Sequence, residues 1–160
     1  MNEQEIIRKT VESVLSSYMP LQDMNLKIAT ALIEKVEQKA AEMGFPAVVA
    51  VFDKAGRPVA IHCMDGAYMG SFDVALNKTF TCAAFKMSTK VLGELAQPGA
   101  DLYGIQYTNE GKIVIFGGGE PLMIGDRLIG ALGVSGGTAQ QDTALAAYGK
   151  EILKEVLQCQ

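Results

Sequence analysis

The feature that most constrains this chain is the glycine-rich stretch Phe116–Asp142, which holds eight of the seventeen glycines in the sequence. Glycine lacks a Cβ atom, so it allows sharp backbone bends and close approach between neighbouring segments. A density this high exceeds ordinary loop usage. We therefore expect tight turns between short strands, with other parts of the chain packed closely against them.

A helix is expected to begin at the end of this stretch, at Thr138. Thr138 and Gln141 have the spacing of a capping box, in which each side chain binds the other residue's free backbone amide. Ser135-Gly136-Gly137 precedes the first helical turn, where outward-pointing amides attract carboxylates and phosphates. An anion site at Gly136-Gly137-Thr138 is one interpretation, and tight hairpin geometry alone is the other.

Hydrophobic periodicity and turn residues predict an α+β domain with a largely antiparallel sheet of five strands. The expected strands are Ala47–Phe52, Pro58–Met64, Lys112–Phe116, Pro121–Ile124 and Arg127–Val134. The expected helices are Glu3–Met19, a helix capped by Asn25 and closed by Gly44, Ser71–Phe85, a helix from a Thr89 cap through Ala96, and the helix after Thr138. The segment Gln97–Gly111 is expected to be irregular.

The chain of 160 residues is long enough for one domain with its own core. We expect residues 1–22 to form an N-terminal helical arm and residues 23–160 to form that domain. Ile7, Val11 and Val14 recur on the arm at helical spacing, and Pro20 marks the end of the helix. Exchange of such an arm between subunits is a plausible role for it.

Composition excludes several classes of function. The net charge of −4 argues against nucleic acid or an anionic membrane as the main partner, since both require a basic surface. No uncharged apolar run is long enough to span a bilayer. The three cysteines form no C-x-x-C pair, which argues against a disulfide framework or a zinc site and favours the cytoplasm as the location.

His62 is the only histidine, so a site with several histidine ligands cannot be built within one chain. It shares a strand face with Ala60 and Met64, and a packed or partly exposed position is the simplest interpretation. The alternatives are a metal-ligating role toward a tetrapyrrole, or a general base. Cys63 and Cys82 are interpreted as small apolar residues rather than nucleophiles.

The helix Ser71–Phe85 carries Asp73, Asn77 and Lys78 on its predicted polar side. A lysine next to the glycine-rich turns could pair with ligand carboxylates or phosphates, and a solvated surface charge is the alternative, more so for Lys86 at the end of the helix than for Lys78. Neither G-x-G-x-x-G nor G-x-x-x-x-G-K-[ST] occurs in the sequence, which argues against nucleotide binding by a Rossmann or P-loop device.

Ordered motifs make the sequence similar to the GlcG/HbpS-like family, often called haem-degrading, which also forms the C-terminal domain of PduO-type corrinoid adenosyltransferases. The resemblance covers about Leu26 to Tyr148. The motifs are V-x-D-x-x-G at Val51–Gly56, M-D-G-A at Met64–Ala67, A-L-x-K at Ala75–Lys78, G-G-x-P at Gly118–Pro121, and G-x-x-G-V-S-G-G-T-x-x-Q-D at Gly130–Asp142. The last motif is long and specific.

The resemblance implies a profilin-like fold, a five-stranded antiparallel sheet flanked by helices, assembled into homo-oligomers. It also implies binding of haem or a corrinoid, and a link to cobalamin-dependent diol or glycerol metabolism or to glycolate metabolism. The matched positions that we expect to form the site are Asp65, Gly66, Lys78, Gly118, Gly119, Ser135, Gly136 and Gln141. Cys63 departs from the family pattern, because many relatives carry an arginine immediately before M-D-G-A.

Three functions are compatible with these residues. The first is an oligomeric accessory protein that binds a tetrapyrrole, haem or a corrinoid, with His62 or a methionine reaching the metal. The second is an enzyme acting on a small hydroxy- or oxo-acid, with Asp65 or Lys78 as the acid–base group. The third is an interaction subunit without a small ligand, for example a partner of a diol or glycerol dehydratase system.

Overall fold

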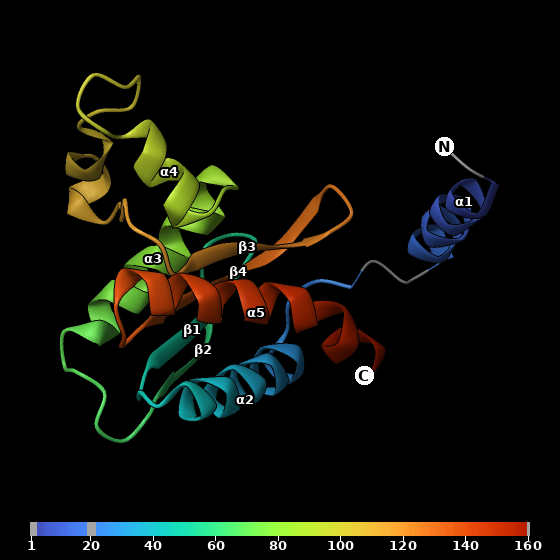
Figure 1. Cartoon of the computed structure of the whole chain (residues 1–160), viewed down its shortest axis with the longest axis horizontal. Coiled ribbons are helices and arrows are strands. Elements are labelled where there is room, and N and C mark those ends of the chain that lie inside the picture. Colours follow the sequence, from blue (N-terminus) through green and yellow to red (C-terminus); the bar gives the residue numbers. More distant parts are fainter. Residues whose placement is uncertain (1–2, 19–21, 160) are drawn as a thin grey trace.

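Two β-hairpins form the central sheet of the structure, a computed structural model that describes residues 3–18 and 22–159 (Figure 1). The first hairpin consists of β1 (Val48–Asp53) and β2 (Pro58–Cys63), and the second of β3 (Gly119–Ile124) and β4 (Arg127–Ser135). The strand order is β2-β1-β4-β3, and each neighbouring pair is antiparallel. The predicted α+β class and antiparallel sheet are confirmed.

The prediction of five strands is wrong, because the sheet formed by the described residues has four. The expected strand Lys112–Phe116 is instead irregular chain that packs against Thr81 of α3 (Ser71–Phe85) and Gly93 of α4 (Thr89–Leu95). The amide of Val114 donates to Oγ1 of Thr81 at 3.0 Å, and Ile113 is buried. The backbone of this segment therefore binds a helix side chain and not a neighbouring strand.

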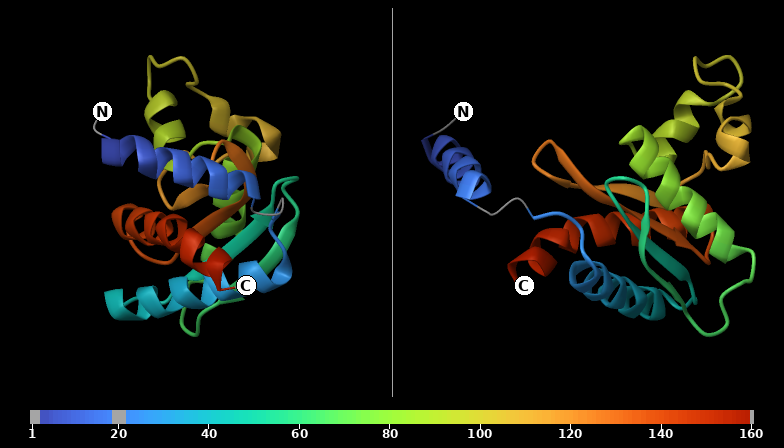
Figure 2. Two further views of the ribbon diagram at one scale, coloured as in Figure 1. Left: turned by 90° about the vertical axis from the view of Figure 1, so that its right-hand side faces the viewer. Right: turned by 180° about the vertical axis from the view of Figure 1, so that it is seen from behind.

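Helices cover both faces of the sheet and give a three-layer domain, as Figures 1 and 2 show from several sides. α2 (Leu26–Met43) and α5 (Ala139–Gln158) lie together on one face, and α3 (Ser71–Phe85) lies on the other. Val49 and Val51 of β1 enter the larger core under α2 and α5. Val48, Ala50 and Phe52 alternate with them and face α3.

Most of the helix boundaries follow the expected capping residues. The Asn25 side chain accepts from the Ile28 amide, and Gly44 ends α2 in the left-handed conformation with φ of 82°. Thr138 and Gln141 form the predicted capping box at the start of α5. The predicted Thr89 cap is wrong by one residue: Ser88 caps α4 (Thr89–Leu95), and Thr89 is buried inside the helix.

The close packing of α3 on the sheet depends on one strand glycine. A Cβ atom added at Gly133 of β4 would overlap Oγ1 of Thr79 and the carbonyl oxygen of Ala75. Thr79 is fully buried, and its hydroxyl donates to the same Ala75 oxygen at 2.7 Å. The missing side chain on β4 lets the backbone of α3 lie directly against the strand.

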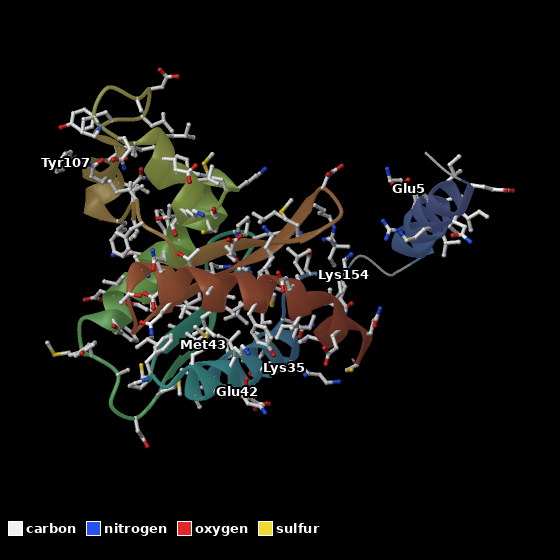
Figure 3. The ribbon with its side chains drawn as sticks, viewed as in Figure 1. Glu5, Lys35, Glu42, Met43, Tyr107 and Lys154 are labelled. Atoms are coloured by element: carbon white, nitrogen blue, oxygen red, sulfur yellow. The ribbon has the colours of Figure 1, made fainter. Side chains whose placement is uncertain are left out.

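The predicted irregular segment Gln97–Gly111 contains two short 3-10 helices, η1 (Ile105–Tyr107) and η2 (Asn109–Gly111). The segment extends from the sheet beyond α4, and its aromatic side chains reach solvent: Tyr103 is 64% exposed and Tyr107 is 82% exposed. Figure 3 labels Tyr107 at the outer end of this excursion.

An ion cluster fixes the point where the chain enters the domain. Asp23 contacts Lys54 Nζ and Arg127 Nη1, each at 2.6 Å, and Arg127 also donates to the Gln22 carbonyl at 2.8 Å. Lys54 lies in the β1–β2 turn and Arg127 begins β4. Both hairpin turns are therefore tied to the residues that precede α2.

The N-terminal helix α1 (Glu3–Tyr18) lies away from the three layers in the views of Figures 1 and 2. Its presence agrees with the predicted helix in the arm. The predicted end of this helix at Pro20 falls outside the described residues, as do the side chains of Leu15 and Tyr18.

We predict that Gly133→Ala destabilises the domain by about 1 to 3 kcal/mol, because the new methyl group overpacks the α3–β4 contact. Urea unfolding followed by circular dichroism measures the change in the free energy of unfolding. Gly70→Ala is the matched control, since a Cβ atom there would have nothing within 4 Å and the backbone is already helical. Equal stability of the two variants would contradict the packing argument.

Candidate functional site

A buried ion pair joins α3 to α5 at the end of β4. Nζ of Lys78 donates to Oδ2 of Asp142 at 2.8 Å and to the carbonyl oxygen of Val134 at 2.8 Å. The Lys78 side chain is completely buried, and the Asp142 side chain is 4% exposed. The expectation that Lys78 lies on the polar side of its helix is therefore wrong. The helix turns it toward the sheet, where Asp142 and Val134 satisfy the ammonium group.

Asp142 also holds the glycine loop that precedes α5. Its Oδ1 atom accepts from the amides of Gly136 at 3.2 Å and Gly137 at 2.9 Å. The interpretation of these amides as free anion donors is wrong, because the chain's own carboxylate occupies them. The physical basis of the interpretation was sound, since amides at a helix N-terminus do attract a carboxylate.

Phe116 covers the buried lysine from outside. Its ring centroid lies 5.0 Å from Nζ of Lys78, within the range of a cation–π contact, and the residue is 47% exposed. Burial lowers the pKa of Lys78, and the hydrogen bond that Lys78 donates to Asp142 opposes that shift. A partly exposed aromatic ring is thus one of the direct neighbours of the buried ammonium group.

The predicted turn Gly117–Gly119 packs directly on this pair. A Cβ atom at Gly118 would lie 2.5 Å from Lys78 Nζ and 2.8 Å from Cβ of Asp142. One at Gly119 would lie 2.8 Å from Cys82 and from Thr89, and the Gly119 amide donates to Oγ1 of Thr89 at 3.0 Å. The glycines therefore bring the backbone close to protein side chains.

The structure gathers six of the predicted site residues at the junction of β4, α3 and α5: Lys78, Gly118, Gly119, Ser135, Gly136 and Gln141. Ser135 is buried and its hydroxyl lies 3.1 Å from that of Ser71, the first residue of α3. Gln141 accepts from the Thr138 amide at 2.8 Å, so its side chain serves the helix cap.

Asp65 and Gly66 lie outside this junction, in the exposed turn between β2 and α3. Gly66 has φ of 86°, and a Cβ atom there would lie 3.7 Å from Cγ of Pro46. Pro46 also borders Gly136, where an added Cβ atom would overlap its carbonyl oxygen. The β2–α3 turn and the glycine loop are thus neighbours through Pro46. The side chains of Tyr68 and Met69 in this turn are 76% and 94% exposed.

His62 lies elsewhere, on the sheet face covered by α2. Its Nδ1 atom is 3.1 Å from Oε2 of Glu37 on α2, and the His62 side chain is 37% exposed. A neutral imidazole that donates from Nδ1 keeps Nε2 as an acceptor. Carboxylates orient metal-ligating histidines in this way, so the pair fits a ligand to a metal, including the iron of a tetrapyrrole.

Sequence reasoning missed three residues: Asp142 and Phe116 at the α3–α5 junction, and Glu37 beside His62. Asp142 ends the glycine-rich motif, and its position after Gln141 in the first turn of α5 was the available signal. Phe116 was assigned to a strand that does not form. Glu37 is 25 residues from His62, and no local pattern joins them.

Within residues 3–18 and 22–159 there is no cluster of three or more histidine, cysteine, aspartate or glutamate side chains arranged to hold a metal ion. No helix of the described chain is long and apolar enough to cross a membrane.

The sequence of residues 24–151 matches a family described as haem-degrading protein HbpS-like. A 15.0 kDa Citrobacter freundii protein encoded in the dhaT–dhaS intergenic region is 41% identical over 83% of this chain and 94% of its own length. The corrinoid adenosyltransferase PduO of Citrobacter freundii is 32% identical, over 91% of this chain and 45% of its length. The alignment therefore covers less than half of that enzyme.

Two solved structures share both sequence and fold with this chain. Klebsiella pneumoniae protein ORFY has a TM-score of 0.80 and 38% identity, covering 85% of this chain and 94% of ORFY. A structure of a PduOC:heme complex has a TM-score of 0.78 and 33% identity, covering 81% and 94% of the two chains. The fold of Streptomyces reticuli HbpS is also similar, with a TM-score of 0.73 at 22% identity over 86% of this chain and 91% of HbpS.

We predict that Lys78→Met costs about 3 to 5 kcal/mol of unfolding free energy, because it leaves the buried Asp142 carboxylate without its counter-charge. Urea unfolding measures the loss. The exposed lysine at the end of α3 provides the control, Lys86→Met, which should stay near the wild-type value.

The double variant Lys78→Met/Asp142→Asn should be more stable than Lys78→Met alone. Asparagine removes the buried charge and keeps an oxygen that can accept from the loop amides. If the double variant instead lost the sum of the two single effects, the two side chains would not act as a coupled pair.

Proposed function

Because the chain belongs to the HbpS-like family of haem-degrading proteins, we propose that it is a small oligomeric accessory protein that binds a tetrapyrrole, haem in the first instance. The observation that carries this proposal is the haem complex of PduOC, a structure that shares sequence and fold over most of this chain. The haem complex is that of PduOC, and we propose haem binding for the present chain by similarity.

The proposed metal ligand is Nε2 of His62. His62 is the only histidine in the sequence, and Glu37 holds its other ring nitrogen. The side chain is partly exposed at the edge strand β2, so a planar ligand can approach it without unfolding the core. Bound haem supplies a redox-active iron, and Glu37 fixes the imidazole ring and its tautomer.

The remaining predicted site residues take two proposed roles. Asp65 and Gly66 lie in the exposed β2–α3 turn, which begins directly after Cys63 and carries the apolar side chains of Tyr68 and Met69. We assign this turn to contact with the macrocycle, since exposed aromatic and methionine side chains suit a flat apolar ligand. The residues at the α3–α5 junction hold the neighbouring glycine loop in place.

A corrinoid is the second ligand in this proposal. Its support is the similarity to PduO, which is a corrinoid adenosyltransferase, over part of that enzyme. We place the protein beside cobalamin-dependent diol or glycerol metabolism, or glycolate metabolism, and a dehydratase system of that kind is the proposed partner. The adenosyltransferase activity of the full-length relative is not part of the proposal.

The alternative of an enzyme acting on a hydroxy- or oxo-acid has less support. The Lys78 side chain is completely buried, and its ammonium group already donates to Asp142 and Val134, so it is not presented to a substrate. Asp65 is exposed in the turn between β2 and α3. An acid–base group normally works inside a site that limits water access.

We predict that titration with haemin produces a saturable Soret shift in the wild-type protein. His62→Ala should lose the spectral signature of histidine ligation. Glu37→Gln should retain the signature but bind about tenfold more weakly, as expected when the group orienting a ligand is altered. Glu42→Gln, an exposed change on the same helix, is the matched control and should behave as wild type.

Cobalamin titrated in parallel separates the two ligand classes. Absence of a saturable shift with both haemin and cobalamin would overturn the proposed function. An unchanged haem spectrum in His62→Ala would leave haem binding in place and would contradict the assignment of the metal ligand.

A further inference from the structure

The two edges of the sheet are closed to different degrees. The strand order β2-β1-β4-β3 leaves β2 and β3 at the margins (Figure 1). On β3, the amide of Gly119 donates to Oγ1 of Thr89 at 3.0 Å instead of to a strand. Pro121 follows at the next position that faces the same way, and proline has no amide hydrogen. The β3 edge is therefore closed to another strand at both positions.

The edge of β2 keeps free backbone groups at Ile61 and Cys63. The Met64 amide donates to the Ala47 carbonyl at 3.0 Å, and the β1–β2 register continues from this pair to Ile61 without a shift. Residues of an antiparallel ladder alternate between facing the partner strand and facing away from it. The backbone of His62 therefore faces β1, whereas the amides and carbonyls of Ile61 and Cys63 point outward. No hydrogen bond joins these outward groups to any residue of the described chain.

Little on β2 prevents another strand from pairing with it. Natural edge strands are usually protected by charged side chains, proline, bulges or a covering segment. Pro58 and the register shift opposite Val51 and Phe52 protect the start of β2. The stretch Val59–Cys63 carries no lysine, arginine, aspartate or glutamate, and the Cys63 side chain is exposed. The second half of β2 is therefore an open template for a strand.

We propose that β2 of one copy pairs antiparallel with β2 of a second copy, and that this pairing closes the approach to His62. In the proposed register, Ile61 of each copy lies opposite Cys63 of the other. The register follows from the free groups, because each Ile61–Cys63 pair can exchange both of its backbone hydrogen bonds. The two sheets then become one sheet about a two-fold axis. The closing of His62 rests on its proposed role as haem ligand, whereas the pairing itself does not.

A second copy suits this edge better than an extended peptide does. The open part of β2 is short, so a peptide gains few backbone hydrogen bonds there, each worth about 0.5 to 1.5 kcal/mol. A second copy also brings its own α2, which packs on β1 and β2. Neighbouring strands are about 4.8 Å apart and packed helices about 8 to 10 Å, so the two α2 helices meet once the strands pair. The contact then includes side chains as well as backbone.

The composition of the α2 flank predicts a reversible contact. Glu37 marks the side of α2 next to β2, because it binds His62, and helical spacing places Thr30, Glu34 and Ala41 on the same side. The two-fold axis makes the two α2 helices antiparallel, so Glu34 meets the small Ala41 of the second copy. The two Glu37 carboxylates come near each other, and like charges weaken a contact. We therefore expect copies that pair and separate with concentration.

Pairing closes the edge through which a planar ligand reaches His62. In the proposed register His62 lies opposite His62 of the second copy, at a non-hydrogen-bonded position, where Cβ atoms are about 4.5 to 5.5 Å apart. This spacing leaves no room for a macrocycle between the two rings, and an α2 helix stands on either side of them. Ligand binding at His62 and pairing of β2 therefore oppose each other, and each weakens the other by the same factor.

Disulfide cross-linking without haemin tests the pairing. The background variant Cys63→Ser/Cys159→Ser removes the two exposed thiols, and the buried Cys82 stays. His62→Cys in this background sets two thiols opposite each other, so oxidised glutathione should link the two copies. Arg57→Cys is the matched control: the Arg57 side chain is 81% exposed against 37% for His62, but its two copies are about 30 Å apart in the joined sheet. A covalent dimer yield no higher for His62→Cys than for Arg57→Cys would overturn the proposal.

A proline on the edge gives a second test. Cys63→Pro removes an outward amide and leaves the β1–β2 ladder intact, because that amide does not face β1. Cys63→Ser keeps the amide and is the matched control. At equal protein concentration, light scattering should give a lower mean mass for Cys63→Pro than for Cys63→Ser, with unchanged circular dichroism. Equal masses for two folded variants would contradict the pairing.

Haemin titration of the same two variants tests the closing of His62, which both of them keep. Cys63→Ser should bind haemin more weakly at high protein concentration than at low concentration, where the copies separate. Cys63→Pro should bind equally well at both concentrations. Binding that is independent of concentration in both variants would show that pairing does not close the site. Absence of binding in both would overturn the proposed function, and with it the closing of the site, while the cross-linking result would still decide the pairing.

Discussion

The buried contact between Lys78 and Asp142 is the interaction on which the rest of the domain depends. A buried ion pair is tolerated only when hydrogen bonds satisfy both charged groups, because removing the charges from water costs several kcal/mol. Here the ammonium group has Asp142 and Val134, and the carboxylate has Lys78 and the amides of Gly136 and Gly137. One small network thus joins α3, the end of β4 and the start of α5. Gly118 leaves room for this ion pair, and Gly133 leaves room for the backbone of α3 against β4.

Local rules predicted much of this fold. Asn25, Gly44, Thr138 and Gln141 mark helix ends because their capping groups act within a few residues, and the two hairpins follow from their short turns. The failures involve distant partners. Lys78 was placed on the polar side of its helix as a ligand-binding residue, and its actual partner is 64 residues away. The run Lys112–Phe116 has the composition of a strand, but the Thr81 hydroxyl binds the Val114 amide, and the strand ladder does not extend to it. Neither outcome has a local signature.

The same reasoning explains why the candidate site was predicted only in part. The glycine motif correctly brought Ser135, Gly136 and Lys78 to one place, yet it could not show that Asp142 fills the anion position. His62 was recognised as a ligand candidate by its residue type, whereas the orienting carboxylate of Glu37 required the packing of α2 on β2. These features lie in different places. The α3–α5 junction holds the glycine loop, the edge strand β2 carries His62, and the N-terminal arm joins the domain at the opposite end of β4.

Native-state hydrogen exchange at the amides of Gly136 and Gly137 tests the central claim most directly. If Asp142 binds both amides inside a buried network, their exchange should be protected to a degree comparable with the β4 core, and Asp142→Ala should remove that protection while distant β1 amides keep theirs. Exchange of Gly136 and Gly137 at the rate of an open loop in the wild-type protein would contradict the account, because the glycine-rich turns would then be free of the ion pair.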